Sequence, residues 1–136
     1  MESMSDTIPA AFLDLFTTKI AFAHLATIFP DGAPQVTPVW FEYDGTHIII
    51  NTARGRAKDK NMRRDPRVSL AVSDPENPYR YIQLRGTVVE MTEQGGDAVI
   101  DRLAKKYMGV DSYPYRNASE VRVTVKILPQ RSQVTG

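Results

Sequence analysis

The chain has 136 residues, of which 42% are hydrophobic and 24% charged, and its formal net charge is +1. These values indicate a single globular domain over residues 1–136 with a modest core, and the absence of cysteine excludes disulfides and thiolate sites. The two histidines lack zinc-site spacing, and no apolar stretch reaches the roughly 20 residues of a membrane span, so we expect no metal and no membrane contact. Because residues 1–6 also lack the basic and apolar regions of a signal peptide, we expect a cytoplasmic protein.

The first half of the chain predicts one short helix and three strands. The candidate capping residues Ser5, Asp6 and Thr7 precede an apolar stripe, which predicts a helix through about Thr17. Three strand-like segments follow at residues 20–29, 34–43 and 47–52. Asp-Gly turns separate them, and such turns between short apolar runs are typical of an antiparallel meander.

The second half predicts two helices and three more strands. A basic helix ends at Asp65-Pro66, and an amphipathic helix covers residues 97–108 with Gly109 as its C-cap. The strand-like segments lie at residues 67–73, 79–91 and 120–128, and residues 74–78 read as a polar turn without strand character. Six strands and three short helices in this order predict a mainly β fold, a closed or partly closed antiparallel barrel.

Residues 54–67 concentrate positive charge. They contain seven Lys or Arg against two Asp, a local charge of +5, whereas the other 122 residues together carry −4. Helix starts favour acidic residues, because the macrodipole is positive there, so cations at this start break a local preference. The segment also follows a strand and a glycine turn, where free backbone N–H groups attract anions. It therefore predicts a phosphate or carboxylate site, and a solvated helix face is the alternative. No aromatic stacking motif accompanies it, so we expect no nucleic-acid partner.

Helical periodicity predicts which of these residues point inward. At about 100° per residue, Lys58 and Asn61 share a helix face with Met62, and other cations occupy the opposite face. Met62 belongs on the core side, so we expect Lys58 and Asn61 to point inward as well. A buried lysine requires a partner, and few acidic residues lie nearby in the sequence to supply one.

Three motifs together resemble a known family. The first is Asp-Gly-x-Pro-Gln-Val-Thr-Pro-Val-Trp, which ends at Trp40, and the third is Arg-Gly-Thr-Val, which begins at Arg85. The second and longest, Ile-Asn-Thr-x-x-x-Arg-Ala-Lys-x-x-Asn-Met-Arg-Arg-Asp-Pro-Arg-Val, begins at Ile50. Over about residues 20–89 the chain resembles the pyridoxamine 5′-phosphate oxidase-like split-barrel family, whose members bind flavin or deazaflavin.

The resemblance implies a six-stranded antiparallel split β-barrel and a homodimer with two equivalent cofactor sites at the subunit interface. Lys58 and Arg56 would hold the phosphate of the cofactor, and residues 35–40 would lie alongside its ring system. The implied cofactor-binding residues are Gln35, Thr37, Pro38, Val39, Trp40, Asn51, Thr52, Arg56, Ala57, Lys58 and Asn61. No side chain is assigned a catalytic role, because the ring of the cofactor carries the hydride.

Within the family, the Arg-Ala-Lys-x-x-Asn form followed by Arg-Arg-Asp-Pro is most similar to the reductases that use the deazaflavin coenzyme F-420. This similarity implies hydride transfer between F-420 and an unsaturated small organic substrate. The surplus cations of the basic segment suit the phosphodiester and oligoglutamate tail of F-420; they are Arg54, Lys60, Arg63 and Arg64. The alternatives are an FMN-dependent oxidoreductase on the same fold and a non-catalytic flavin or deazaflavin carrier or sensor.

Overall fold

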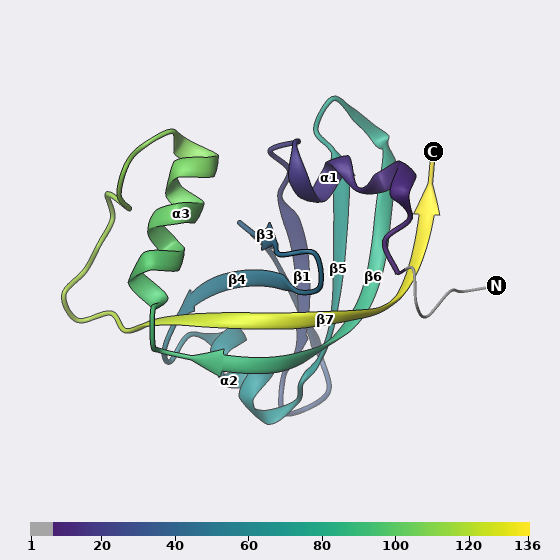
Figure 1. Ribbon diagram of the computed structural model, residues 1–136. Helices are drawn as coiled ribbons and strands as arrows, with labels where there is room; N and C mark the ends of the chain where they lie inside the picture. The colour runs from purple at the N-terminus through teal and green to yellow at the C-terminus, as the bar shows by residue number, and fades with distance from the viewer. Residues whose placement is uncertain (1–6) are drawn as a thin grey trace.

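The computed structural model describes residues 7–136, in which short helices pack around a curled antiparallel sheet (Figure 1). The helical elements are the 3-10 turn η1 (Ala10–Phe12) and the helices α1 (Asp14–Thr17), α2 (Ala57–Arg64) and α3 (Gly96–Met108). The strands are β1 (Ala23–Ile28), β2 (Pro34–Val39), β3 (Glu42–Tyr43), β4 (Ile48–Ala53), β5 (Arg67–Asp74), β6 (Asn77–Thr92) and β7 (Arg122–Thr135). No helix among the described residues is long and apolar enough to cross a bilayer.

The sheet has seven strands in the order β2-β1-β5-β6-β7-β4-β3, so the predicted number of six is wrong. The difference arises because residues 34–43 read as one continuous strand in the sequence. In the structure β2 pairs with β1 at one end of the sheet, whereas β3 pairs with β4 at the other end. The chain therefore bends at Trp40 and Phe41, and this short connection joins the two ends of the sheet into a partly closed barrel.

The barrel remains split beside this connection. Within residues 7–136, β3 pairs with Ile48 and Ile49 alone, the rest of β4 has no strand partner on that side, and the outer edge of β2 is free. Pro34 and Pro38 suit such an edge, because proline has no N–H group to leave unpaired. Helix α2 follows β4 directly and contacts both β4 and β1, so it lies next to the opening.

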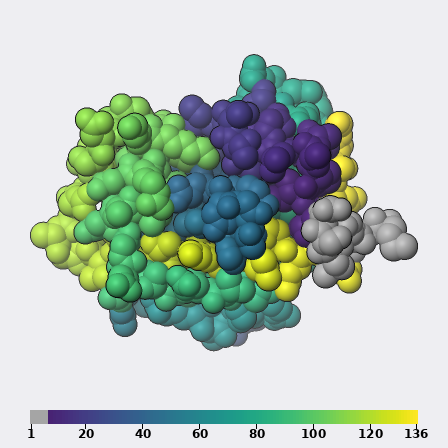
Figure 2. All heavy atoms as spheres, in the orientation of Figure 1, coloured from purple at the N-terminus to yellow at the C-terminus, as the bar shows by residue number. Residues whose placement is uncertain are grey.

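The core lies inside the curl of the sheet. Inward-facing side chains alternate along the strands, as in β5, where Val68, Leu70 and Val72 are buried. Phe16 of α1 packs edge-to-face on Phe41 and closes one end of this core. A second apolar cluster joins α3 to the outer side of β4 and contains Val99, Ile100, Leu103, Ile49 and Trp40. Figure 2 shows the N-terminal helices packed beside β3, with α3 on the other side of that strand.

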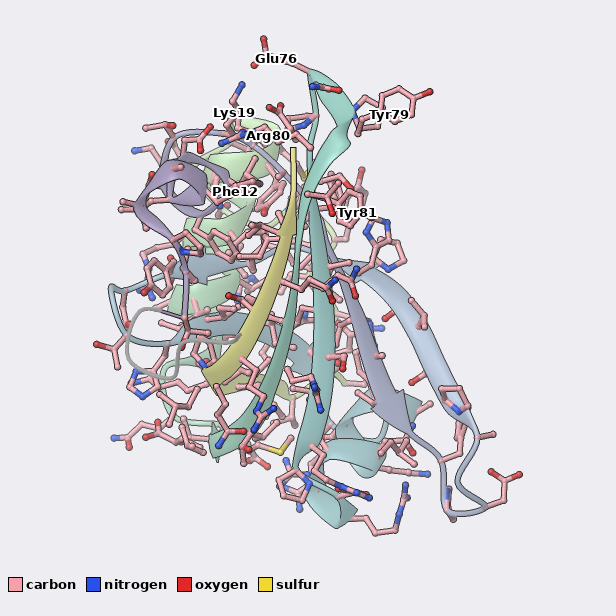
Figure 3. The ribbon with its side chains drawn as sticks, turned by 90° about the vertical axis from the view of Figure 1, so that its right-hand side faces the viewer. Phe12, Lys19, Glu76, Tyr79, Arg80 and Tyr81 are labelled. Carbon is pink, nitrogen blue, oxygen red and sulfur yellow. The ribbon has the colours of Figure 1, made fainter. Side chains whose placement is uncertain are left out.

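The N-terminal helical segment is fastened to the β5–β6 hairpin by charge. Arg80 of β6 contacts the carboxylate of Asp14 at 2.7 Å and that of Asp74 at 3.0 Å, and its guanidinium lies 4.8 Å from the centre of the Phe12 ring (Figure 3). Lys19 forms a further ion pair with Glu76. These contacts hold η1 and α1 over the open end of the barrel. The predicted helix through Thr17 is thus confirmed as a 3-10 turn followed by one α turn, while the capping residues Ser5 and Asp6 lie outside the described residues.

Two strands extend beyond the predicted bounds. β6 begins at Asn77, so the turn within residues 74–78 is tighter than predicted. β7 continues to Thr135 because it follows β6 through an irregularity between Arg85 and Gly86 and keeps pairing beyond it. The polar residues at this end of β7 lack an apolar alternation, which explains why periodicity did not reveal them. The predicted Gly109 C-cap of α3 is confirmed, with φ at 72° and its N–H bonded to Lys105.

One tyrosine of α3 holds the connection between the two sheet ends. The hydroxyl of Tyr107 donates to the carbonyl of Ala21 at 2.6 Å and accepts the N–H of Phe41 at 3.1 Å. Burial raises the pKa of this phenol to about 12. The neighbouring Lys106 donates to the carbonyl of Phe41 at 2.7 Å, and burial lowers the pKa of its amine. Both polar groups of Phe41 are therefore satisfied from α3.

We expect Tyr107→Phe to lower the free energy of unfolding by about 1–3 kcal/mol, because two buried backbone groups lose their hydroxyl partner. Urea denaturation followed by circular dichroism measures this change. Tyr79→Phe is the matched control: Tyr79 is 82% exposed, and we expect its substitution to change stability by less than about 0.5 kcal/mol. Similar losses in both variants would contradict a specific role for the Tyr107 hydroxyl.

Candidate functional site

The candidate site is centred on Lys58 in the first turn of α2. Its side chain is half-buried, and it makes no hydrogen bond or ion pair with any of the described residues 7–136. Burial lowers the pKa of its amine, and the nearby positive charges of Arg56 and Arg122 lower it further. We call Arg56, Lys58 and Arg122 the cation cluster. An unpaired, partly desolvated amine among like charges is a position that favours an anionic ligand.

The local sequence explains why Lys58 lacks a partner. Gly55 adopts φ of 90° in the turn after β4, which lets the chain enter α2 directly. The adjacent acidic residue, Asp59, is 2% exposed and is used for structure: it accepts the N–H of Gly55 at 2.8 Å and pairs with Arg63 at 2.9 Å. Met62 is buried as predicted, and Lys58, on the same helix face, is turned toward the molecule. The carboxylate of Asp59 is bonded to Gly55 and Arg63, so it does not pair with Lys58.

Arg122 is a member of the cluster that sequence reasoning missed. It begins β7 and is 8% exposed, which is unusual for a charged residue. Its Nε donates to the Asn51 side chain at 2.7 Å, and its Nη1 contacts Glu120 at 3.2 Å. Its proximity to Lys58 depends on the pairing of β4 with β7, which sequence distance conceals. The available signal was a lone arginine at the start of an apolar strand.

Asn51 and Thr52 lie at the end of β4, on different faces. The amide of Asn51 donates to the carbonyl of Gly96 at 2.9 Å, so it links the start of α3 to Arg122. The approach is close, since a Cβ on Gly96 would lie 2.5 Å from the carbonyl oxygen of Arg122. Thr52 is buried, and its hydroxyl has no partner among the described residues. Asn51 therefore lies beside the cation cluster and is bonded to Arg122, whereas the side chain of Thr52 is closed to solvent.

Gln35 and Asn61 form a separate polar group. Asn61 is buried, as predicted, and its amide donates to Thr27 at 3.1 Å and to Gln35 at 3.4 Å. Thr27 also donates to Gln35 at 3.0 Å. These bonds tie α2 to β1 and β2, across the split in the barrel. Asn61 is therefore occupied in positioning the helix that carries Lys58.

The remaining predicted residues lie along β2 and at the start of α2. Val39 is 7% exposed and packs in the core, so its side chain is closed to a ligand. Thr37 is half-buried, while Pro38 and Ala57 are exposed. No group of three or more histidine, aspartate or glutamate side chains within residues 7–136 is arranged to hold a metal ion.

Trp40 belongs to an aromatic wall that reaches the cation cluster. Its ring is stacked on Tyr107 at 5.3 Å with an interplanar angle of 6°, and it meets Tyr113 edge-on at 6.3 Å. We call Trp40, Tyr107 and Tyr113 the aromatic wall. The guanidinium of Arg122 lies 5.5 Å from the centre of the Tyr113 ring, which connects the wall to the cations. A cavity of about 130 Å³ opens between Tyr113, Arg122 and Glu120.

Most of the other cations of residues 54–67 have internal partners. Arg54 pairs with Glu93, Arg63 with Asp59, and Arg67 with Asp65. Arg64 donates to the carbonyl of Ile28 and contacts the Asn61 side chain. The surplus of charge expected to serve a ligand is thus largely neutralised by the protein itself. Lys60 is exposed and makes no such contact among the described residues.

Comparison with known proteins gives one family and several structures. A family model described as pyridoxamine 5′-phosphate oxidase matches residues 10–135. An F420 reductase of known structure is 30% identical, with 93% of this chain and 98% of that chain covered and a TM-score of 0.82. A conserved hypothetical protein from Mycobacterium tuberculosis is 28% identical, with 99% and 89% covered and a TM-score of 0.74. A heme storage protein from Vibrio cholerae, 16% identical with 93% and 94% covered and a TM-score of 0.67, shows the fold alone.

We expect Lys58→Met to raise the melting temperature at pH 7, because the variant removes a partly buried charge that the ligand-free protein does not pair. A gain of 1 kcal/mol would raise it by about 4 °C. The pKa of the Lys58 amine is lower in the folded state than its ordinary value of 10.5. The charged amine therefore destabilises the folded protein below the lowered pKa, and this destabilisation disappears as the pH rises toward 10.5. The gain should therefore shrink between neutral pH and pH 10.5. Calorimetry at several pH values tests this, with the exposed Lys60→Met as the control that should stay flat.

Proposed function

Because the chain belongs to the pyridoxamine 5′-phosphate oxidase family, we propose that it is an oxidoreductase that binds coenzyme F-420 and acts on an unsaturated small organic substrate. The choice of F-420 is supported by the F420 reductase that is 30% identical over nearly the whole chain. The surplus of cations does not add to this choice, since most of them have internal partners. The family and the site chemistry also accommodate FMN, which is the alternative cofactor.

The observation that carries the proposal is the unpaired amine of Lys58 in a cation cluster whose Arg122 contacts the aromatic wall. Lys58 offers a charge-assisted hydrogen bond to a phosphate, and Trp40 and Tyr113 offer flat apolar surface to a ring system. A cofactor that combines an anionic group with a planar ring satisfies both features at once. A carrier or sensor that binds the same cofactor without turnover would use the same contacts, so activity has to be measured separately.

The residues of this chain would bind and orient the cofactor. Lys58 would hold the phosphate, Asn51 would keep Arg122 in place through their hydrogen bond, and β2 would border the ring. The aromatic wall would exclude water from that side. When bound, the deazaflavin supplies or accepts the hydride, so no nucleophilic side chain is needed.

We further propose a two-fold homodimer with the cofactor at the subunit interface. The sheet face opposite the core is supportive: it exposes Val36 (61%) and Val134 (40%) and carries a groove of about 290 Å³ between His24 and Gln133. Figure 3 shows Tyr79 and Tyr81 projecting on the side of the sheet opposite Phe12. A small domain with such a face is stabilised by covering it, and a stable dimer buries more than about 1,200 Å².

The cofactor choice is tested by following Trp40 fluorescence during titration with F-420 and with FMN. We expect F-420 to bind more tightly than FMN, and Lys58→Met to raise its dissociation constant about 10- to 150-fold, because one charge-assisted contact is lost. Lys60→Met should leave binding within about threefold, since an exposed charge contributes little. Tight FMN binding with weak F-420 binding would reverse the cofactor assignment. An unchanged dissociation constant in Lys58→Met would remove Lys58 from the site.

The dimer is tested by analytical ultracentrifugation at micromolar concentration. We expect the wild-type protein to sediment at twice the chain mass of 15.3 kDa, and Val36→Glu to shift it toward the monomer by burying a charge in the interface. Leu13→Glu, at a 39% exposed position in the N-terminal helical segment, should leave the dimer intact. A wild-type monomer would exclude both the dimer and an interface site.

A further inference from the structure

Two arginines of the cation cluster share one carboxylate. Oε2 of Glu120 lies 2.7 Å from Nη2 of Arg56, and Oε1 of the same carboxylate lies 3.2 Å from Nη1 of Arg122. Each oxygen therefore has its own guanidinium partner. We call Arg56 and Arg122 the arginine clamp. The geometry is that of a site for an anion with two free oxygens, and a residue of the protein occupies it.

The clamp and Lys58 together carry more positive charge than the protein neutralises. Lys58 lies near both arginines, and Glu120 is the carboxylate that pairs with them, so three cations and one carboxylate leave a local charge of +2. The other acidic residues nearby are paired elsewhere, Asp59 with Arg63, Glu93 with Arg54, and Asp97 with Arg116. The arginines lower the pKa of Glu120, so its carboxylate is charged near neutral pH. Glu120 thus offsets part of the repulsion and leaves Lys58 without a counter-ion.

The backbone around Glu120 is anchored, so its side chain can move alone. The N–H of Glu120 donates to the carbonyl of Asn117 at 3.0 Å, and the carbonyl of Val121 accepts the N–H of Arg54 at 2.9 Å. The side chain of Glu120 is 24% exposed, which gives it a path to solvent by rotation about its own bonds. Leaving the clamp therefore requires no displacement of the loop or of β7.

We propose that the arginine clamp is a second anion position of the site, which Glu120 fills in the ligand-free protein and which a carboxylate or phosphoryl group of the ligand takes over. The inference rests on the proposed function, in which Lys58 receives a first anionic group. A ligand with two anionic groups then displaces Glu120, whereas a ligand with one leaves it in place. Glu120 in this way sets a threshold for binding and favours ligands that carry both groups.

Pyrophosphate, which has two phosphoryl groups, tests the clamp without any cofactor. Isothermal titration of the wild-type protein and of Glu120→Gln compares the site with and without the internal carboxylate. We expect Glu120→Gln to bind pyrophosphate about 5- to 30-fold more tightly, because a competing charge-assisted contact is removed. Glu93→Gln is the matched control, since it removes one negative charge from the neighbouring Arg54 pair and leaves the clamp unchanged.

Glu120→Asp separates occupancy from charge. It keeps the negative charge but shortens the side chain by one methylene, so it cannot span both arginines. If Glu120 acts by filling the clamp, this variant also binds pyrophosphate more tightly than wild type. If only Glu120→Gln gains affinity, the effect is one of net charge, and the proposal is wrong.

Two other results would also overturn it. Weaker binding by Glu120→Gln would mean that Glu120 orients the arginines for the ligand, and equal affinity or no binding in all four proteins would mean that the clamp takes no external anion. The pyrophosphate titrations do not depend on the flavin or deazaflavin titrations. If the cofactor assignment fails, the pyrophosphate test still stands. If the pyrophosphate test fails, the role of Lys58 is still decided separately by the titration of Lys58→Met.

Discussion

Much of this molecule depends on the short connection at Trp40 and Phe41, where the chain crosses from one end of the sheet to the other. A continuous strand could not pair with both β1 and β4, so the crossing makes two edge strands, and among the described residues β4 beyond Ile49 pairs with β7 but not with β3. The cation cluster lies where β4 passes into α2. Since both polar groups of Phe41 are bonded to α3, the same helix that covers β4 also holds the barrel in its split form.

The hydrogen bonds of Asp59 explain why the neighbouring Lys58 is unpaired among the described residues. Asp59 is adjacent to Lys58 in the sequence, yet its buried carboxylate caps the turn at Gly55 and pairs with Arg63. A carboxylate used in this way cannot also neutralise Lys58. The protein thereby keeps a partly desolvated amine that has no partner within residues 7–136, a costly arrangement that favours an external anion. Conversely, cations that looked available in the sequence, such as Arg54, have partners supplied by distant segments.

Local sequence patterns predicted much of this fold and part of the site. Turn residues between short apolar runs marked most of the strands, and helical periodicity placed Met62, Asn61 and Lys58 toward the molecule. Patterns of this kind are local, so they did not reveal what pairs with what across long separations. Strand pairing explains three features that the sequence did not reveal. It breaks residues 34–43 into two strands, extends β7, and brings Arg122 next to β4. Asn61 was likewise expected near a phosphate, yet its amide bonds to Thr27, a contact between distant segments.

The pairing of β4 with β7 also bears on the order of folding. Two of the strand pairs, β1 with β2 and β5 with β6, join neighbours in the sequence and can form early. In contrast, β4 pairs along its whole length with β7, the last strand. Contacts of this kind close large loops and form slowly. The bond between Asn51 and Arg122 spans 71 residues, and Glu120 lies just before the same strand. The charged site is therefore assembled late, because Arg122 and Glu120 reach Lys58 only when β7 lies against β4.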